Sequence, residues 1–252
     1  MDRAHLEPSE VGALVIDIKG LELSWQPGAP RVLAIDDLTV AQGERLFIKG
    51  PSGSGKSTLL SLISGVTTAT VGSVRVIDQA LEQLSSVKRD HFRADHVGYI
   101  FQMFNLIPYL SVVDNVTLSC RFSARRRAQA LSRGKDLDAE ARRLLKHLDM
   151  DHPDLHRRAV TTLSVGQQQR VAAARALMGA PELLIADEPT SALDADRRES
   201  FIQLLFDECR ESGATLVFVS HDASLEHLFD RTVDLAAVNR AGPHSPADIG
   251  EG

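Results

Sequence analysis

The sequence predicts a single α/β domain, and three observations lead to this prediction. Short β-rich runs alternate with amphipathic helical stretches along most of the 252 residues. Residues 183–186 and 215–220 form apolar runs, as expected of parallel strands that are buried on both faces. The chain is long enough to bury one substantial hydrophobic core, and it contains no apparent internal repeat. We therefore expect one copy of any site that the domain carries.

The predicted elements follow one another in a regular order. Strands are expected at residues 14–18 and 21–25 (or as one bent strand), 32–40, 45–49, 73–77, 97–101, 183–186 and 215–220. Helices are expected at residues 56–64, within 111–150, at 164–178 and at 196–212. The polar ends, residues 1–12 and 241–252, are expected to be flexible tails around one domain at 13–240. Within it, a helical subdomain is expected at about residues 90–165.

The amino-acid composition argues against some classes of function. The formal net charge of −6 argues against a nucleic-acid partner, which would normally meet a basic face. Cys120 and Cys209 lie in no CxxC pattern and have no metal-ligand spacing, so we expect two reduced cytosolic thiols. The N-terminal residues do not read as a signal peptide, and no apolar run is long enough to span a bilayer. If the protein acts at a membrane, we expect another chain to provide the membrane part.

A phosphate-binding loop is the strongest local motif. Residues 50–57 match G-x-x-x-x-G-K-[ST], and they stand between an apolar strand and a helix, as the motif requires. The predicted nucleotide-binding residues here are Gly50, Pro51, Ser52, Gly53, Ser54, Gly55, Lys56, Ser57 and Thr58. Such a loop points its N–H groups at a phosphate, and the helix adds its positive end. Lys56 would reach the β- and γ-phosphates, and the Ser57 hydroxyl would ligate Mg²⁺. The alternative, a chance Gly-Ser loop, does not explain the flanking strand and helix.

Two carboxylates follow the apolar run at residues 183–186. In a phosphate-loop protein, this strand end is where Mg²⁺ and the attacking water lie. Asp187 suits the metal side of the site, and Glu188 is placed to polarise the hydrolytic water. A solvated acidic strand end is the alternative interpretation. The phosphate loop upstream favours the catalytic one.

A second polar, glycine-containing element precedes the acidic strand. Residues 163–170 read Leu-Ser-Val-Gly-Gln-Gln-Gln-Arg, and Ser164 and Gly166 open a predicted helix. A hydroxyl and free N–H groups at the positive end of a helix make a second phosphate site. A single γ-phosphate does not need two complete binding sites from the same chain. The alternative is an ordinary polar helix start.

With these motifs in this order, the chain resembles the nucleotide-binding subunits of ABC transporters, from about Leu14 to Asn239. By eye it is most similar to the subgroup of lipoprotein-release, macrolide-efflux and cell-division ATPases. The resemblance implies a P-loop NTPase fold with a RecA-like core, an antiparallel β subdomain and a helical subdomain. It also implies an ATPase that uses ATP and Mg²⁺, dimerises head to tail with a second copy, and drives a separate integral membrane permease. Such a subunit is cytoplasmic and peripheral on the inner face of the membrane.

The resemblance also implies roles for individual residues. Trp25 would stack on adenine, Gln102 would sense Mg²⁺ and the attacking water, and His221 would contact the γ-phosphate. Asp194 lies in a loop that would pass between the two subunits. The residues that would face the ATP of the partner subunit are Ser164, Gly166 and Gln167. Val165 departs from the usual pair of glycines, and as a β-branched residue it should be helical or extended.

Two further segments are expected at the surface. Residues 103–110 are apolar, which indicates core packing or, by resemblance, a groove wall that receives a short helix of the membrane partner. Residues 121–127 are basic, and we prefer a solvated face to contact with anionic lipid headgroups. A DNA-repair or translation ATPase of the same family would carry a long coiled coil or a second cassette. A GTPase would carry Asn-Lys-x-Asp, which is absent here.

Overall fold

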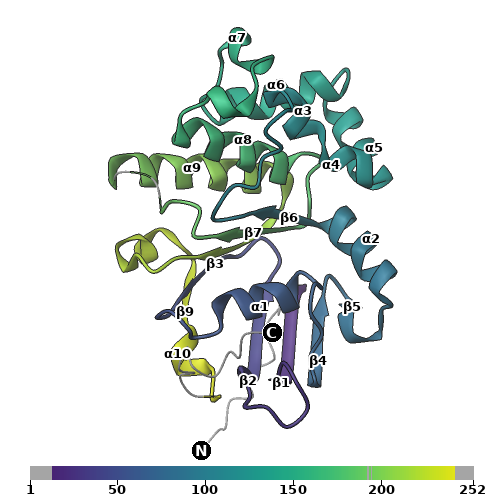
Figure 1. Ribbon diagram of the computed structural model, residues 1–252, viewed down its shortest axis with the longest axis vertical. Helices are drawn as coiled ribbons and strands as arrows, with labels where there is room; N and C mark the ends of the chain where they lie inside the picture. Colours follow the sequence, from purple (N-terminus) through teal and green to yellow (C-terminus); the bar gives the residue numbers. More distant parts are fainter. Residues whose placement is uncertain (1–12, 192, 194, 242–252) are drawn as a thin grey trace, which may run out of the picture.

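Two β-sheets and the helices that pack around them make up the structure (Figure 1). The computed structural model describes residues 13–191, 193 and 195–241. The parallel sheet lies in the middle of the view, with the antiparallel sheet below it and most of the helices above. The predicted tails at 1–12 and beyond residue 241 lie outside the described residues.

The antiparallel sheet is formed by the N-terminal part of the chain. Its strands, in spatial order, are β2 (Leu33–Ala41), β1 (Leu14–Leu23), β4 (Val71–Val76) and β5 (Gln79–Ala80). The predicted strands at 14–18 and 21–25 are one strand, bent where the β1–β4 register shifts between Lys19 and Glu22. Gly20 has φ 54° at this bend, a left-handed conformation that glycine adopts readily.

The parallel sheet carries the expected buried strands. Its spatial order is β6 (Val97–Ile100), β7 (Leu183–Asp187), β8 (Thr215–Val219), β3 (Arg45–Lys49) and β9 (Arg231–Asp234). All four neighbouring pairs are parallel. The carboxyl ends of the five strands therefore meet at one edge of the sheet.

Helices pack on both faces of the parallel sheet. Those outside the segment between β6 and β7 are α1 (Lys56–Ile63), α2 (Ser86–His96), α9 (Ala195–Ser212) and α10 (Leu235–Val238). Those between β6 and β7 are α3 (Val112–Thr117), α4 (Ser119–Phe122), α5 (Ala124–Arg133), α6 (Leu137–His147), α7 (Pro153–His156) and α8 (Val165–Leu177). Short 3-10 turns are η1 (Leu81–Gln83), η2 (Val160–Thr162) and η3 (Ala223–Leu228). Side-chain caps start several of these helices; Ser85, Ser111, Ser123 and Asp136 each accept an N–H three residues on.

Alternating side chains of the parallel strands enter two separate hydrophobic clusters. Phe47 and Phe218 join the cluster that contains the helices between β6 and β7. Leu46, Ile48 and Val217 join the cluster that contains the antiparallel sheet and α1. The parallel sheet is thus buried on both faces, which explains why its strands are continuous apolar runs. The predicted limits of the helical subdomain stay a prediction; within them, β6 pairs with β7 in the parallel sheet.

The interpretation of residues 121–127 as a solvated face is wrong at Arg126. This side chain is 4% exposed, whereas Arg125 and Arg127 on either side are exposed. Its guanidinium donates to the carbonyl oxygens of Met178 (2.7 Å) and Ala176 (2.5 Å). Burial lowers the pKa of Arg126 to about 10, so the group stays charged at neutral pH. Arg126 therefore ties α5 to the carboxyl end of α8, where orphan carbonyls attract a cation.

Candidate nucleotide-binding site

The motifs predicted from sequence converge because the core sheet is parallel. The phosphate loop follows β3, the carboxylates Asp187 and Glu188 end β7, His221 follows β8 and Gln102 follows β6. Strands β7, β8 and β3 are neighbours in the sheet, so the first three of these groups leave adjacent strand ends. The four segments lie far apart in sequence and share one edge of the sheet.

The phosphate loop has the backbone that its glycines allow. Gly53 (φ 80°) and Gly55 (φ 96°) both take left-handed conformations that would strain another residue. Gly55 is the N-cap of α1, so the first-turn N–H groups of the helix open toward the loop. A Cβ on Gly50 would lie 2.6 Å from Oγ of Ser54, so a side chain here would force Ser54 to shift.

Lys56 folds back over the loop. Its Nζ donates to the carbonyl oxygens of Gly50 (2.6 Å) and Pro51 (3.0 Å). An ammonium held by neutral carbonyls is free to exchange them for the stronger acceptors of a phosphate. Burial raises the pKa of the Asp187 carboxyl, and the positive charge of Lys56 opposes this rise, so the lysine lies near the acidic strand end.

Asp187 stands in an electrostatic setting that favours a bound cation. Burial and the charge of Glu188 raise its pKa above the ordinary value, against the opposing effects of Lys56 and a hydrogen bond from Tyr99. Ser57, Gln102 and Asp187 offer hydroxyl, amide and carboxylate oxygens, which are the ligands that Mg²⁺ prefers. The donor set therefore fits the predicted metal. The sequence did not predict a role for Tyr99 in the site, because a tyrosine inside a strand is usually interpreted as a packing residue.

Glu188 is held in place by the segment that follows β8. Its Oε2 lies 2.9 Å from Nδ1 of His221 and 3.4 Å from Oγ of Ser220. Its N–H donates to the carbonyl of Val219 at 2.9 Å. Its φ is +46°, an unusual conformation for a residue other than glycine, and strain of this kind gathers at functional sites. Ser220, the residue before His221, was not predicted from sequence.

The start of α8 is a capping box. Oγ of Ser164 accepts from the N–H of Gln167 (3.3 Å), and Oε1 of Gln167 accepts from the N–H of Ser164 (3.0 Å). Each of these two side chains thus already accepts one hydrogen bond from the backbone of its own helix start. Val165 and Gly166 are the first two helical residues, whose N–H groups have no intrahelical acceptor. Val165 is half exposed and has no positive φ, as expected from its β-branched side chain.

The other predicted residues are placed as follows. Trp25 is 55% exposed in the turn between β1 and β2, and Gln102 is exposed two residues after the end of β6. Asp194 lies outside the described residues. Leu193 of the same loop lies 3.6 Å from where a Cβ on Gly166 would be. The roles given to these side chains stay predictions.

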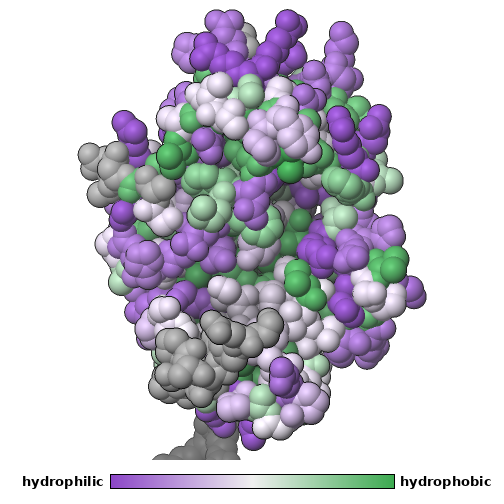
Figure 2. All heavy atoms as spheres, viewed as in Figure 1, coloured by the Kyte–Doolittle hydropathy of each residue, from purple (hydrophilic) through white to green (hydrophobic). Residues whose placement is uncertain are grey.

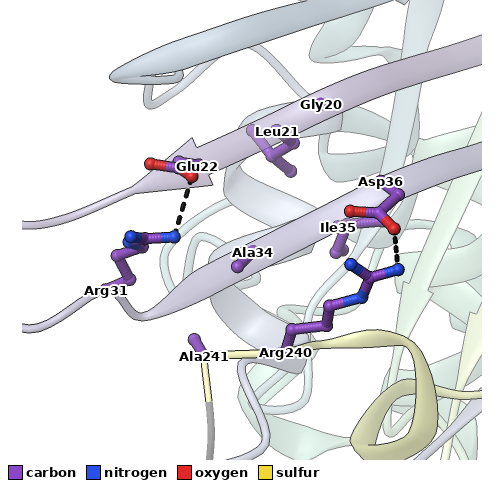
Figure 3. A pocket seen from close by; sticks show the side chains of 9 residues that line it. All are labelled: Gly20, Leu21, Glu22, Arg31, Ala34, Ile35, Asp36, Arg240 and Ala241. Carbon is purple, nitrogen blue, oxygen red and sulfur yellow. Dashed lines mark hydrogen bonds and ion pairs between the residues drawn. The ribbon is translucent and has the colours of Figure 1, made fainter.

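A pocket in the described part of the chain lies away from the phosphate loop. It measures about 480 Å³ and opens over β1, β2 and the C-terminal residues Arg240 and Ala241 (Figure 3). Two ion pairs, Arg31 with Glu22 and Arg240 with Asp36, cross its walls. Its lining includes no residue of the phosphate loop. This pocket is therefore separate from the phosphate loop.

The fold and the site define a P-loop ATPase: a parallel sheet with a phosphate loop, an acidic strand end and a helix start that presents N–H groups. A family model described as "ABC transporter" matches residues 33–191. The chain belongs to this family, as an ATP-binding subunit that hydrolyses ATP. This confirms the predicted fold class and enzymatic activity.

Individual relatives agree with this assignment. An uncharacterised ABC transporter ATP-binding protein of Mycobacterium tuberculosis (strain H37Rv) is 38% identical, over 90% of this chain and 91% of its own. The lipoprotein-releasing system ATP-binding protein LolD of Shewanella denitrificans is 38% identical, over 81% of this chain and 84% of its own. The ATP-binding cassette MJ0796, solved as a post-hydrolysis dimer with ADP and Pi, superimposes with a TM-score of 0.76 at 31% identity. That match covers 91% of this chain and 97% of the other. The subgroup predicted from sequence is confirmed.

Proposed function

We propose that two copies of this chain close head to tail around two molecules of Mg²⁺-ATP and drive a separate membrane permease. The observation that carries the proposal is the pairing of two phosphate sites in one chain. One is the phosphate loop with Asp187 and Glu188, and the other is the start of α8 at Ser164 and Gly166. A two-fold dimer gives the second site a role, because it can complete the first site of the partner copy.

Each group has a chemical task in this arrangement. The loop N–H groups and Lys56 would bind the β- and γ-phosphates, while Ser57, Asp187 and Gln102 would hold Mg²⁺ directly or through water. Magnesium supplies charge neutralisation of the phosphate oxygens when bound. Glu188 would orient and polarise the attacking water, and His221 would fix that carboxylate and approach the γ-phosphate. Trp25 would stack on the adenine ring, and Asp194 would lie between the subunits.

An apolar surface beside β6 supports the permease partner. Met103 is 81% exposed, Tyr109 83% and Phe122 70%. A pocket of about 230 Å³ lies between Phe101 and Phe122. Figure 2 shows hydrophobic side chains at the surface over the middle of one face, between the hydrophilic helical end and the antiparallel sheet. Phe101 and Phe122 are the exposed aromatic residues that line this pocket, and they suit the apolar side of an inserted helix.

The proposed location follows from that partner. Within the described residues, none of the helices has both the length and the apolar character needed to cross a membrane. We place the protein in the cytoplasm, held at the inner face of the membrane by the permease. No nucleic-acid partner is proposed.

The variant Glu188→Gln tests this function. It keeps the size of the side chain but removes the base, so kcat should fall by about 100-fold or more while ATP still binds. Size-exclusion chromatography with light scattering should then show an ATP-dependent dimer. Glu182→Gln, at the opposite end of β7, is the matched control and should hydrolyse ATP normally. A monomer at saturating ATP, or normal hydrolysis by Glu188→Gln, would refute the proposal.

A further inference from the structure

Asn239 lies near the end of the described chain, yet its side chain contacts the phosphate loop. Nδ2 donates to the carbonyl oxygens of Ser54 (3.1 Å) and Val32 (3.0 Å). Oδ1 accepts from the N–H groups of Ala34 (2.9 Å) and Ala241 (3.1 Å). The residue is 9% exposed, and these four bonds use both donors and both lone pairs of the carboxamide. The orientation of the amide is therefore fixed.

The bond to Ser54 bears on a backbone donor of the phosphate loop. The peptide unit that joins Ser54 and Gly55 is planar and trans, so its C=O and N–H point in opposite directions. Asn239 holds the carbonyl on the outer side of the loop. The Gly55 N–H is thereby held toward the inner side, where a phosphate is enclosed.

The same side of the loop is also packed. A Cβ on Gly55 would lie 2.6 Å from Cδ2 of Leu33 and 3.5 Å from Nδ2 of Asn239. Leu33 is fully buried at the start of β2. Leu33 of β2 and Asn239 thus both lie close to Gly55, and the hydrogen bond from Asn239 to the Ser54 carbonyl is directional.

Other contacts anchor the C-terminal segment without reaching the loop. The N–H of Arg240 donates to the carbonyl of Ala34 at 2.8 Å. The guanidinium of Arg240 lies across β2 and pairs with Asp36, as Figure 3 shows. Loss of this ion pair therefore loosens the segment but leaves the bond between Asn239 and Ser54 in place.

We propose that Asn239 is a positioning residue for the triphosphate of ATP. It acts through the carbonyl of Ser54, which sets the direction of the Gly55 N–H. It touches no substrate atom itself. The inference rests on the proposed function, in which the phosphate loop binds Mg²⁺-ATP.

The test compares three variants of the full chain. Asn239→Ala removes the amide, and the isosteric Asn239→Asp replaces the donor with an oxygen that cannot bond to the Ser54 carbonyl. Arg240→Ala is the control that only loosens the segment. Steady-state hydrolysis gives KM and kcat for Mg²⁺-ATP, calorimetry gives the dissociation constants of Mg²⁺-ATP and Mg²⁺-tripolyphosphate, and thermal melting shows that each variant is folded.

Both Asn239 variants should raise KM by about tenfold, the effect of about one lost hydrogen bond, with kcat changed less than about twofold. ATP and tripolyphosphate should be weakened by the same factor, because the change lies in the phosphate loop. Arg240→Ala should leave all of these constants unchanged. If Asn239→Ala does not fold, Asn239→Asp gives the same comparison.

Three results would overturn the inference. An equal rise of KM in Arg240→Ala would assign the effect to general anchoring of the segment. Weaker binding of ATP with unchanged binding of tripolyphosphate would place the effect on the adenine side, through Val32. Failure of the wild-type protein to bind either compound would refute the phosphate site itself, which is a separate and recognisable outcome.

Discussion

Oε2 of Glu188 lies 2.9 Å from Nδ1 of His221, and the two side chains leave neighbouring strands of the parallel sheet. The carboxylate is mostly buried, with 12% of its side chain exposed, whereas the imidazole is 71% exposed. The histidine therefore holds the carboxylate from the open side of the site. This geometry couples the orientation of the proposed base to an exposed residue.

Replacement of His221 by Ala should lower kcat by about 100-fold, because Glu188 loses its restraint and the γ-phosphate loses a contact. KM for ATP should change little, since the phosphate loop is untouched. Hydrolysis assays at saturating ATP measure the effect. His227→Ala, which changes an exposed histidine in η3, should behave like the wild type. A variant with normal kcat and raised KM would show that His221 serves binding alone.

At the start of α8, neighbouring residues should respond in opposite ways. Val165→Gly removes a half-exposed side chain from the first helical position, so the ATPase rate should change by less than about threefold. Gly166→Leu should reduce the rate by at least about 100-fold, because its side chain would occupy the approach to the N–H groups. The nearest atom to a Cβ there is Leu193 Cδ2 at 3.6 Å, an ordinary contact, so this variant should still fold. Similar ATPase rates for both variants would show that the start of α8 is not part of the nucleotide site.

The ionised side chain of Asp187 should lower the free energy of unfolding of the nucleotide-free protein at neutral pH. Its pKa is raised in the folded state by burial and by Glu188, so folding disfavours the ionised form. This penalty is absent below the unfolded pKa of about 3.9, where the carboxyl is protonated in both states, and it grows as pH rises through the folded pKa. Asp187→Asn should therefore raise the melting temperature at pH 7 but not near pH 3.5, and it should abolish Mg²⁺-dependent hydrolysis. A lower melting temperature at pH 7 would contradict this.

Removal of Arg126 should destabilise the protein by about 3 kcal/mol, because the carbonyls of Met178 and Ala176 lose a charged donor in a buried position. Urea unfolding measures the change in the free energy of unfolding. Arg127→Ala alters the exposed neighbour and should stay within about 0.5 kcal/mol of the wild type. Equal effects of the two substitutions would contradict the buried, stabilising role given to Arg126.

The predictable part of this site consists of residues that act where strands end. Asp187 and His221 each follow an apolar run, and the run itself marks the end of a parallel strand. Asn239 and Tyr99 carry no such mark. Asn239 bonds to the Ser54 carbonyl, and Tyr99 bonds to Asp187. In each pair the two residues are too far apart in the sequence for a local pattern to predict the contact. The basic run did not predict the burial of Arg126, because such a run indicates only the average exposure of its members, whereas Arg126 and Ala130 of α5 face inward.

The order of strands in the parallel sheet has a consequence for how the protein is made. Strand β3, which carries the phosphate loop, lies between β8 and β9. Both of these neighbours belong to the last part of the described chain to leave the ribosome. The loop is synthesised early, but the sheet that gives it shape closes only when residues 215–234 are present. The parallel sheet is therefore complete only after β9 has been synthesised, and a product truncated before β9 would leave β3, the strand before the phosphate loop, at the edge of the sheet.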